Sequence, residues 1–92
     1  MPEEKSKHPV QVEGYRSLND LAAAVGKLRY DSLAEFMQKT ADDIERQAEA
    51  DEGRGRTQLA ERLRQAADEM YQARDALNLA WKICKPHMED KK

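Results

Sequence analysis

The chain has 92 residues, of which 39% are hydrophobic, 37% are charged and 5% are aromatic. Its length excludes more than one domain, and its composition is typical of long solvated helices rather than of a globule with a large aromatic core. The net charge of −2 excludes a strong overall attraction to nucleic acid or anionic lipid, and no apolar run approaches the ~20 residues of a membrane span. The single cysteine excludes an internal disulfide and indicates a reducing compartment, so we expect a cytoplasmic protein. Because no apolar run is long enough, we expect that it does not enter a membrane.

Residues 1–14 are predicted to form a flexible N-terminal tail. The segment is polar and charged, prolines at positions 2 and 9 disfavour a helix, and Gly14 closes it. It contains no apolar stretch that would serve as a signal peptide. A helical hairpin domain is expected over residues 15–88, followed by a C-terminal tail at 89–92.

The first long helix is predicted over residues 17–51. Ser17 and Asp20 fit a capping box at its start. Apolar or small residues then recur at helical spacings on one side. These residues are Leu18, Leu21, Val25, Leu28, Leu33, Met37, Thr40, Ile44 and Ala48.

This first helix has an alternative, which is a break near Tyr30–Asp31. The apolar stripe jumps five residues from Leu28 to Leu33, and Gly26 just upstream costs ~1 kcal/mol against alanine inside a helix. Residues 32–35 also fit a second capping box. The alternative gives three helices over 17–29, 32–52 and 57–85. We prefer the continuous helix because its length matches that of the second helix.

A glycine-rich turn is predicted over residues 51–57. Gly53 suits the left-handed position that ends a helix, and Thr57 can cap the helix that follows. So short a connection makes the two helices antiparallel neighbours, with position i facing roughly position 108 − i. Ile44 is then expected opposite Leu63.

The second helix is predicted over residues 57–85. Its apolar stripe alternates spacings of four and three without interruption for more than three heptads, which keeps one side against a partner. The stripe consists of Leu59, Leu63, Ala66, Met70, Ala73, Leu77, Ala80 and Cys84. Pro86 lacks the N–H that a continuing helix needs, so the helix is expected to end before it.

Both helices carry more apolar surface than one antiparallel neighbour can cover. Further apolar residues flank the stripe of each helix, among them Ala60, Ala67 and Ile83 on the second. We therefore expect a homodimer in which two hairpins form a four-helix bundle. The residues expected in its core and dimer interface are Phe36, Ile44, Leu63, Met70, Ala73, Leu77, Ala80 and Trp81.

No catalytic constellation can be built from these residues. The two histidines, His8 and His87, lie near the ends of the chain, and no Glu-x-x-His spacing exists for a metal site inside a bundle. No serine or cysteine has a histidine base predicted beside it inside the bundle. We expect neither enzymatic activity nor a cofactor.

Cys84 and His87 are the candidate metal ligands. Across a twofold axis, two copies of each could form a tetrahedral zinc site. A structural interpretation is simpler, because Cys84 occupies the next core position of the stripe and His87 complements the negative C-terminal end of the helix. We therefore expect no metal.

Basic residues gather at the open end of the predicted hairpin, beside Trp81 and two tyrosines. They are Arg16, Lys27, Arg29, Lys82 and Lys85. Cations interleaved with aromatic rings can bind RNA or DNA, and a dimer would double the patch. Five cations in an acidic protein form a modest field, so nucleic-acid binding is the alternative function. The preferred function is that of a non-enzymatic homodimeric interaction or regulatory protein that binds an unidentified protein through an exposed face of the bundle.

In architecture, residues 17–85 resemble the small dimeric four-helix RNA-modulator proteins of the Rop type. They are also similar to the hairpin partners of bacterial secretion systems, although the Trp-x-Gly of those turns is absent here. Neither resemblance rests on a shared diagnostic motif, so each implies an architecture and no specific activity.

Overall fold

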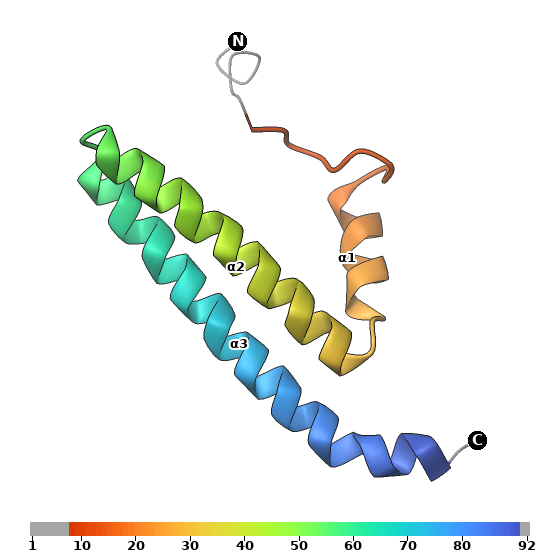
Figure 1. The fold of residues 1–92 in the computed structure, drawn as a ribbon. Helices are drawn as coiled ribbons and strands as arrows, with labels where there is room; N and C mark the ends of the chain where they lie inside the picture. The colour runs from red at the N-terminus through yellow and green to blue at the C-terminus, as the bar shows by residue number, and fades with distance from the viewer. Residues whose placement is uncertain (1–7, 91–92) are drawn as a thin grey trace.

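The computed structural model describes residues 8–90, and the side chains of residues 8–87. This part of the chain contains three helices and no strand: α1 (Leu18–Gly26), α2 (Tyr30–Gly53) and α3 (Thr57–Asp90). Figure 1 shows α2 and α3 side by side as an antiparallel hairpin, with α1 directed away from them. The all-helical hairpin is therefore confirmed. None of the described helices is long and apolar enough to cross a membrane.

The predicted tails are only partly described. Residues 8–16 form neither a helix nor a strand, which agrees with the irregular segment expected before the domain. Residues 1–7 and 91–92 lie outside the described residues.

The preferred continuous first helix is wrong, because the chain leaves the helical conformation at residues 27–29. Leu28 and Leu33 would lie about 140° apart around a continuous helix, so one straight helix could not hold both against the same partner. Gly26 ends α1, and Arg29 takes extended angles (φ −56°, ψ 146°) before α2 begins. The three-helix alternative is therefore correct in the number and order of its helices, although α1 ends at Gly26 rather than at residue 29 and α2 begins at Tyr30 rather than at residue 32.

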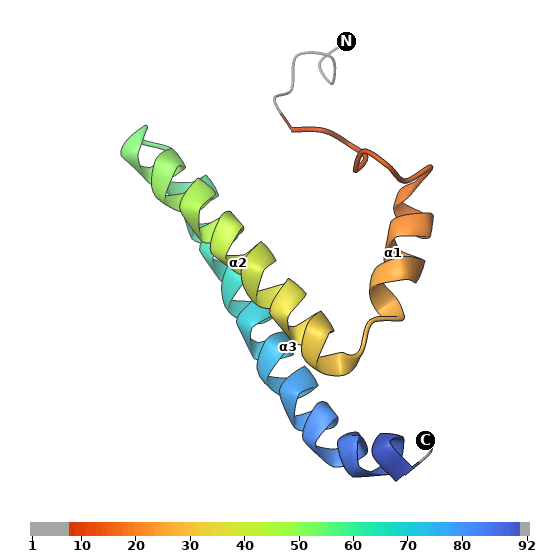
Figure 2. The ribbon, with the colours of Figure 1, turned by 45° about the vertical axis from the view of Figure 1, so that its right-hand side comes forward.

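Helix α1 has a well-formed start but little tertiary support. Ser17 is its N-cap, and the Asp20 N–H donates to Ser17 Oγ at 3.1 Å. None of its nine residues is buried, and Figures 1 and 2 both show it diverging from the hairpin. A helix this short is marginal in water by itself.

The turn between α2 and α3 closes through Gly55. The Gly55 N–H donates to the Glu52 carbonyl at 3.0 Å, and the Arg56 N–H donates to the Asp51 carbonyl at 2.8 Å. These two bonds form a Schellman motif, whose left-handed residue is Gly55, with φ +84°. The prediction that Gly53 takes this position is wrong, because Gly53 remains the last residue of α2.

Alanines form the contact line of the hairpin. Ala34, Ala41 and Ala48 of α2 and Ala60 and Ala67 of α3 are 0–1% exposed, and they are the only buried hydrophobic residues in the described part of the chain. Each set repeats every seven residues, so it follows one side of its helix. The predicted register of roughly 108 − i places Ala41 level with Ala67 and Ala48 level with Ala60. Small side chains let the two helices approach closely.

Six of the eight predicted core residues lie beside this alanine line, whereas Trp81 continues the seven-residue repeat of Ala60 and Ala67, and Phe36 lies on the opposite side of α2. Ile44, Leu63, Met70, Ala73, Leu77, Ala80 and Trp81 are partly exposed, and Phe36 is 41% exposed. The hairpin therefore buries none of the eight. The physical reason is that alanines allow the closest approach of two helices and so occupy the contact line, although the sequence pattern placed only Ala48 on the stripe and the other alanines at its edge.

The predicted end of the second helix at residue 85 is also wrong. Helix α3 continues through Pro86 to Asp90. The proline removes one N–H from the helical ladder without stopping it, and such a residue kinks a helix. Figure 1 shows the last turns of α3 bending away from the axis of the rest.

Candidate interaction site

The alanine line divides the hairpin surface into two faces of different chemistry. At 100° per residue, positions one and four after each alanine lie on one side of a helix, and positions three and six lie on the other. We call the first side the polar face; it carries Asp31, Gln38, Asp42, Glu45, Glu49 and Glu52 of α2 with Arg64, Tyr71 and Asn78 of α3. We call the second the apolar face; it carries Leu33, Met37, Thr40 and Ile44 of α2 with Leu59, Leu63, Ala66, Met70, Ala73, Leu77, Ala80 and Cys84 of α3.

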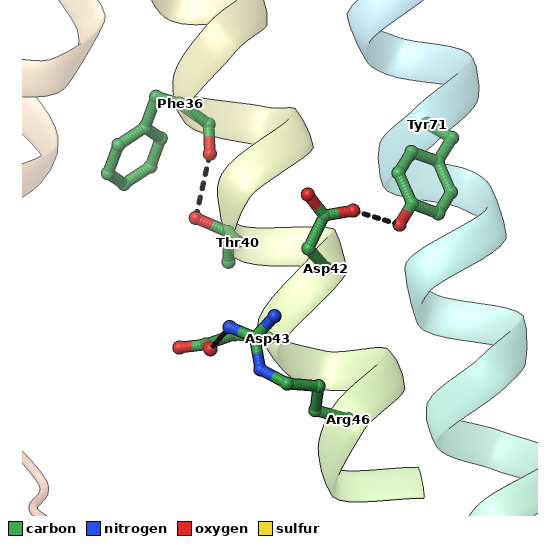
Figure 3. Close-up of polar contacts among 6 residues, drawn as sticks. All are labelled: Phe36, Thr40, Asp42, Asp43, Arg46 and Tyr71. Atoms are coloured by element: carbon green, nitrogen blue, oxygen red, sulfur yellow. Dashed lines mark hydrogen bonds and ion pairs between the residues drawn. The ribbon is translucent and has the colours of Figure 1, made fainter. Parts of the chain in front are cut away.

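Three side-chain bonds join the helices on or next to the polar face. The Tyr71 hydroxyl donates to the Asp42 carboxylate, as Figure 3 shows. Arg74 Nη1 donates to Gln38 Oε1 at 3.1 Å, and Arg64 Nη2 donates to Glu52 Oε1 at 2.7 Å. These bonds join α2 to α3 on the polar side of the hairpin, and both partners of each bond belong to the same chain.

The bonded partners are displaced from the predicted register for a geometric reason. The rule of roughly 108 − i places residue 66 level with Asp42 and residue 70 level with Gln38, whereas the bonded partners are Tyr71 and Arg74. Side chains lean toward the N-terminus of their own helix, so on α2 they lean away from the connecting loop and on α3 they lean toward it. The Cα atoms of Tyr71 and Arg74 therefore lie about one helical turn further from the loop than those of residues level with Asp42 and Gln38.

The hydrogen bond to Asp42 changes the acidity of Tyr71. Together with burial and the negative charge of the carboxylate, it raises the pKa of the Tyr71 phenol to about 12. The phenol therefore stays protonated, and stays a donor, over the whole physiological range.

Replacing Tyr71 by phenylalanine is expected to remove a pH dependence from the stability. Because the folded pKa of about 12 lies above the ordinary 10.0, the contribution of the bond is complete below about pH 10 and is lost as the pH rises toward about 12. Thermal unfolding followed by circular dichroism should show the native chain as the more stable at neutral pH, with the two curves converging at the alkaline end. Tyr30→Phe, at an exposed position, is the control. A stability difference that stays constant across this range would contradict the assignment.

Among the described residues, the apolar face is covered only in part. Eleven of its twelve residues are half-buried, and Leu59 is exposed (45%). Its one hydroxyl is already bonded, since Thr40 Oγ1 donates to the Phe36 carbonyl at 2.8 Å (Figure 3). Burial of this face would therefore remove apolar side chains from water without leaving its hydroxyl group unpaired.

The dimensions of the molecule indicate a single layer of helices. Its thinnest dimension is 13 Å, against a longest dimension of 52 Å. The accessible surface is 7588 Å², against roughly 5,500 Å² for a compact protein of this mass. Domains normally bury an apolar face between two layers, and a second layer is missing here.

The predicted basic patch is only partly assembled. Arg29 donates to Asp31 through Nε at 2.7 Å and through Nη2 at 2.9 Å, and this bond lowers the pKa of the Asp31 carboxyl. The Arg29 guanidinium also lies over the Trp81 ring, 4.9 Å from its centroid. The carboxylate therefore offsets the charge of the cation that lies against the aromatic ring.

The other cations of the patch are dispersed. Arg16 precedes the far end of α1 and pairs with Asp20 at 3.4 Å, so the structure does not bring it to the others. Lys27 lines a hollow at the open end together with Arg29, Tyr30 and Cys84. Lys82 and Lys85 are exposed on α3.

The candidate metal ligands are not joined by further ligands. Cys84 is partly exposed and His87 is exposed in the last turn of α3. Among the residues that the structure describes, no group of three or more His, Cys, Asp or Glu side chains is placed to hold a metal ion.

Arg29 was expected near Trp81 at the open end of the hairpin, and the two side chains are in contact there. The register rule agrees, since it puts residue 79 level with Arg29, two positions from Trp81.

Comparisons of the chain with protein families, curated proteins and solved structures give no match. The class of the protein therefore rests on its own geometry. It is an antiparallel helical hairpin, preceded by the short helix α1, with one polar face whose cross-helix bonds lie within the chain and one partly exposed apolar face.

Proposed function

We propose that this chain is a non-enzymatic interaction protein that pairs with a second copy through the apolar face. Two stacked hairpins form a four-helix bundle, and the outer surface of that bundle binds another protein in a structural or regulatory role. The observation that carries the proposal is that the hairpin buries only alanines, while four leucine and methionine side chains of α3 (Leu59, Leu63, Met70 and Leu77) stay partly exposed along one face.

The shape of the molecule supports pairing. Its accessible surface of 7588 Å² exceeds that of a compact monomer by about 2,000 Å². Each partner in a standard protein interface contributes about 800 Å². Part of the excess belongs to α1 and to the segment before it, and part belongs to the hairpin, whose apolar face is partly exposed. A second copy is the partner present wherever the chain is made, and twofold symmetry closes such an assembly.

The polar face supports the interaction role. Its cross-helix bonds are completed within one chain, so stacking on the opposite face leaves it outside the bundle. Charged surfaces of this kind contribute specificity and association rate to a protein contact. No catalytic chemistry is needed for such a role.

The mass in solution tests the proposal. Light scattering coupled to size exclusion, at micromolar concentration, should give about 21 kDa, twice the chain mass of 10.6 kDa. Circular dichroism on the same sample establishes that the chain is helical. A well-folded particle of about 10 kDa would remove the homodimer and the surface inferred from it.

Nucleic-acid binding is the alternative function, and it can be tested on the same protein sample. The ion pairs of Arg16 and Arg29 weaken the basic patch on which it depends. A salt-dependent shift of RNA or duplex DNA, abolished by Lys82→Glu together with Arg29→Glu, would favour this alternative over protein binding. The absence of a shift at low salt would remove it.

A further inference from the structure

We infer that the second copy packs antiparallel, with α3 lying against α3 of the partner and the twofold axis level with residues 71–72. The two connecting turns then lie at opposite ends of the bundle. This inference rests on the proposed homodimer and adds its orientation and register.

The sizes of the side chains on the apolar face support this orientation. Read in reverse from the partner, position i meets roughly position 143 − i. Large residues then meet small ones along the whole helix: Leu59 meets the partner's Cys84, Leu63 meets the partner's Ala80, Met70 meets the partner's Ala73, and Leu77 meets the partner's Ala66. Alternation of large and small residues across facing positions lets two helices interdigitate without voids or overlap.

The α2 side of the apolar face is centred close to the same level. Its apolar stretch runs from Leu33 to Ile44, so its midpoint lies at residues 38–39. The register of roughly 108 − i places that midpoint level with residues 69–70 of α3, about two residues from the level of the axis. One twofold axis therefore passes near the middle of both stretches.

The charges of the hairpin favour the same orientation. Residues 42–69, around the turn, contain nine carboxylates and five arginines, a net charge of −4. Residues 27–41 and 70–87, at the open end, contain six cations and three carboxylates, a net charge of +3. In an antiparallel pair the acidic half of one copy lies beside the basic half of the other, and complementary charge fixes orientation in this way.

The opposite orientation, with both turns at one end, is disfavoured on both grounds. It stacks α3 on the partner's α2 at roughly 108 − i, which sets Leu63 over the partner's Ile44 and Met70 over the partner's Met37. Large side chains then face large ones. Halves of like charge also become neighbours.

A disulfide between different positions tests the orientation. In a Leu59→Cys chain that keeps Cys84, the two thiols lie ~37 Å apart along one helix, at 1.5 Å per residue. A disulfide requires Cα atoms within about 7 Å, so these thiols can join only across two chains. Mild oxidation should convert most of this variant to a covalent dimer of about 21 kDa on a non-reducing gel, and a reductant should reverse the reaction.

Two matched controls have one thiol each: the native chain, with Cys84 only, and Leu59→Cys combined with Cys84→Ser. In the antiparallel pair each places its two thiols ~37 Å apart, so neither should form a covalent dimer. Leu63→Cys with Ala80→Cys, in a Cys84→Ser chain, gives a second expected pair should the first variant fold poorly.

The outcomes separate the two proposals. A covalent dimer of the native chain through Cys84 alone, or a noncovalent dimer in which neither designed pair crosslinks, overturns the antiparallel register and leaves the homodimer standing. A monomeric mass before oxidation overturns the homodimer itself. Selective crosslinking of both designed pairs supports the inference.

Discussion

Replacing Leu77 by aspartate is expected to abolish the dimer and to leave a chain that is monomeric or unfolded. Leu77 lies on the apolar stripe of α3 and is partly exposed within one hairpin. A carboxylate enclosed at the interface without a partner costs roughly 3–5 kcal/mol, and twofold symmetry introduces it twice. The dissociation constant should rise by about three orders of magnitude or more. Light scattering and circular dichroism together measure the outcome.

The same substitution two residues further along provides the matched control. Leu79 is 60% exposed on the side of α3 that faces away from α2 and from the apolar face. Leu79→Asp should therefore keep the dimeric mass, and so should Glu61→Gln at another exposed position of α3. A Leu77→Asp chain that stays folded at the native mass would contradict the interface. Equal loss of the dimer in Leu79→Asp would place the interface on a different side of α3.

The hairpin itself was predictable because two independent features agree on it. The 3,4 spacing of α3 persists from Leu59 to Cys84, and the glycine-rich turn permits only an antiparallel return. The break after Gly26 was also visible, in the jump from Leu28 to Leu33. We preferred a continuous helix because its length matched that of the second helix. A stripe that rotates by about 140° around a straight helix, however, cannot keep its residues against one partner helix.

The alanine line was harder to predict, for a physical reason. The hydrophobic periodicity of a sequence is set mainly by its large apolar residues, and these define the face whose burial removes the most apolar surface from water. Closest approach of two helices is instead set by the smallest side chains. The seven-residue repeat of Ala34, Ala41 and Ala48 was present in the sequence, but a repeat of small residues does not say whether it faces the same chain or another.

The polar contacts could be predicted least. The bonds from Tyr71 to Asp42 and from Arg29 to Asp31 depend on how far long side chains reach and lean. Spacing rules locate Cα positions, and they miss partners that are displaced by one helical turn. Once antiparallel leaning is taken into account, the same register gives Tyr71 for Asp42 and Arg74 for Gln38 to within about a residue, whereas Arg64 reaches Glu52 from about two turns away.

Enlarging one alanine of the contact line is expected to destabilise the hairpin without touching the apolar face. Ala41 is fully buried between α2 and α3, so leucine at this position must push the helices apart or adopt a strained rotamer, at a cost of about 1–3 kcal/mol. The midpoint of thermal unfolding should fall by roughly 4–8 °C for each kcal/mol in a domain of this size. Ala41→Leu with Ala67→Leu should fall further, because the register places the two alanines level with each other.

The separation of the helices can be measured beside the stability. The pKa of the Tyr71 phenol is raised to about 12 only while Asp42 is close enough to accept its hydrogen bond. In Ala41→Leu this pKa should move back toward the ordinary 10.0, as followed by ultraviolet absorbance during an alkaline titration. Ala50→Leu, at an exposed position of α2, should change neither the melting midpoint nor the phenol. If Ala41→Leu matches the native chain in both measurements, the helices do not meet along the alanines. The apolar stripe would then be the inside of the hairpin rather than the surface offered to a second copy.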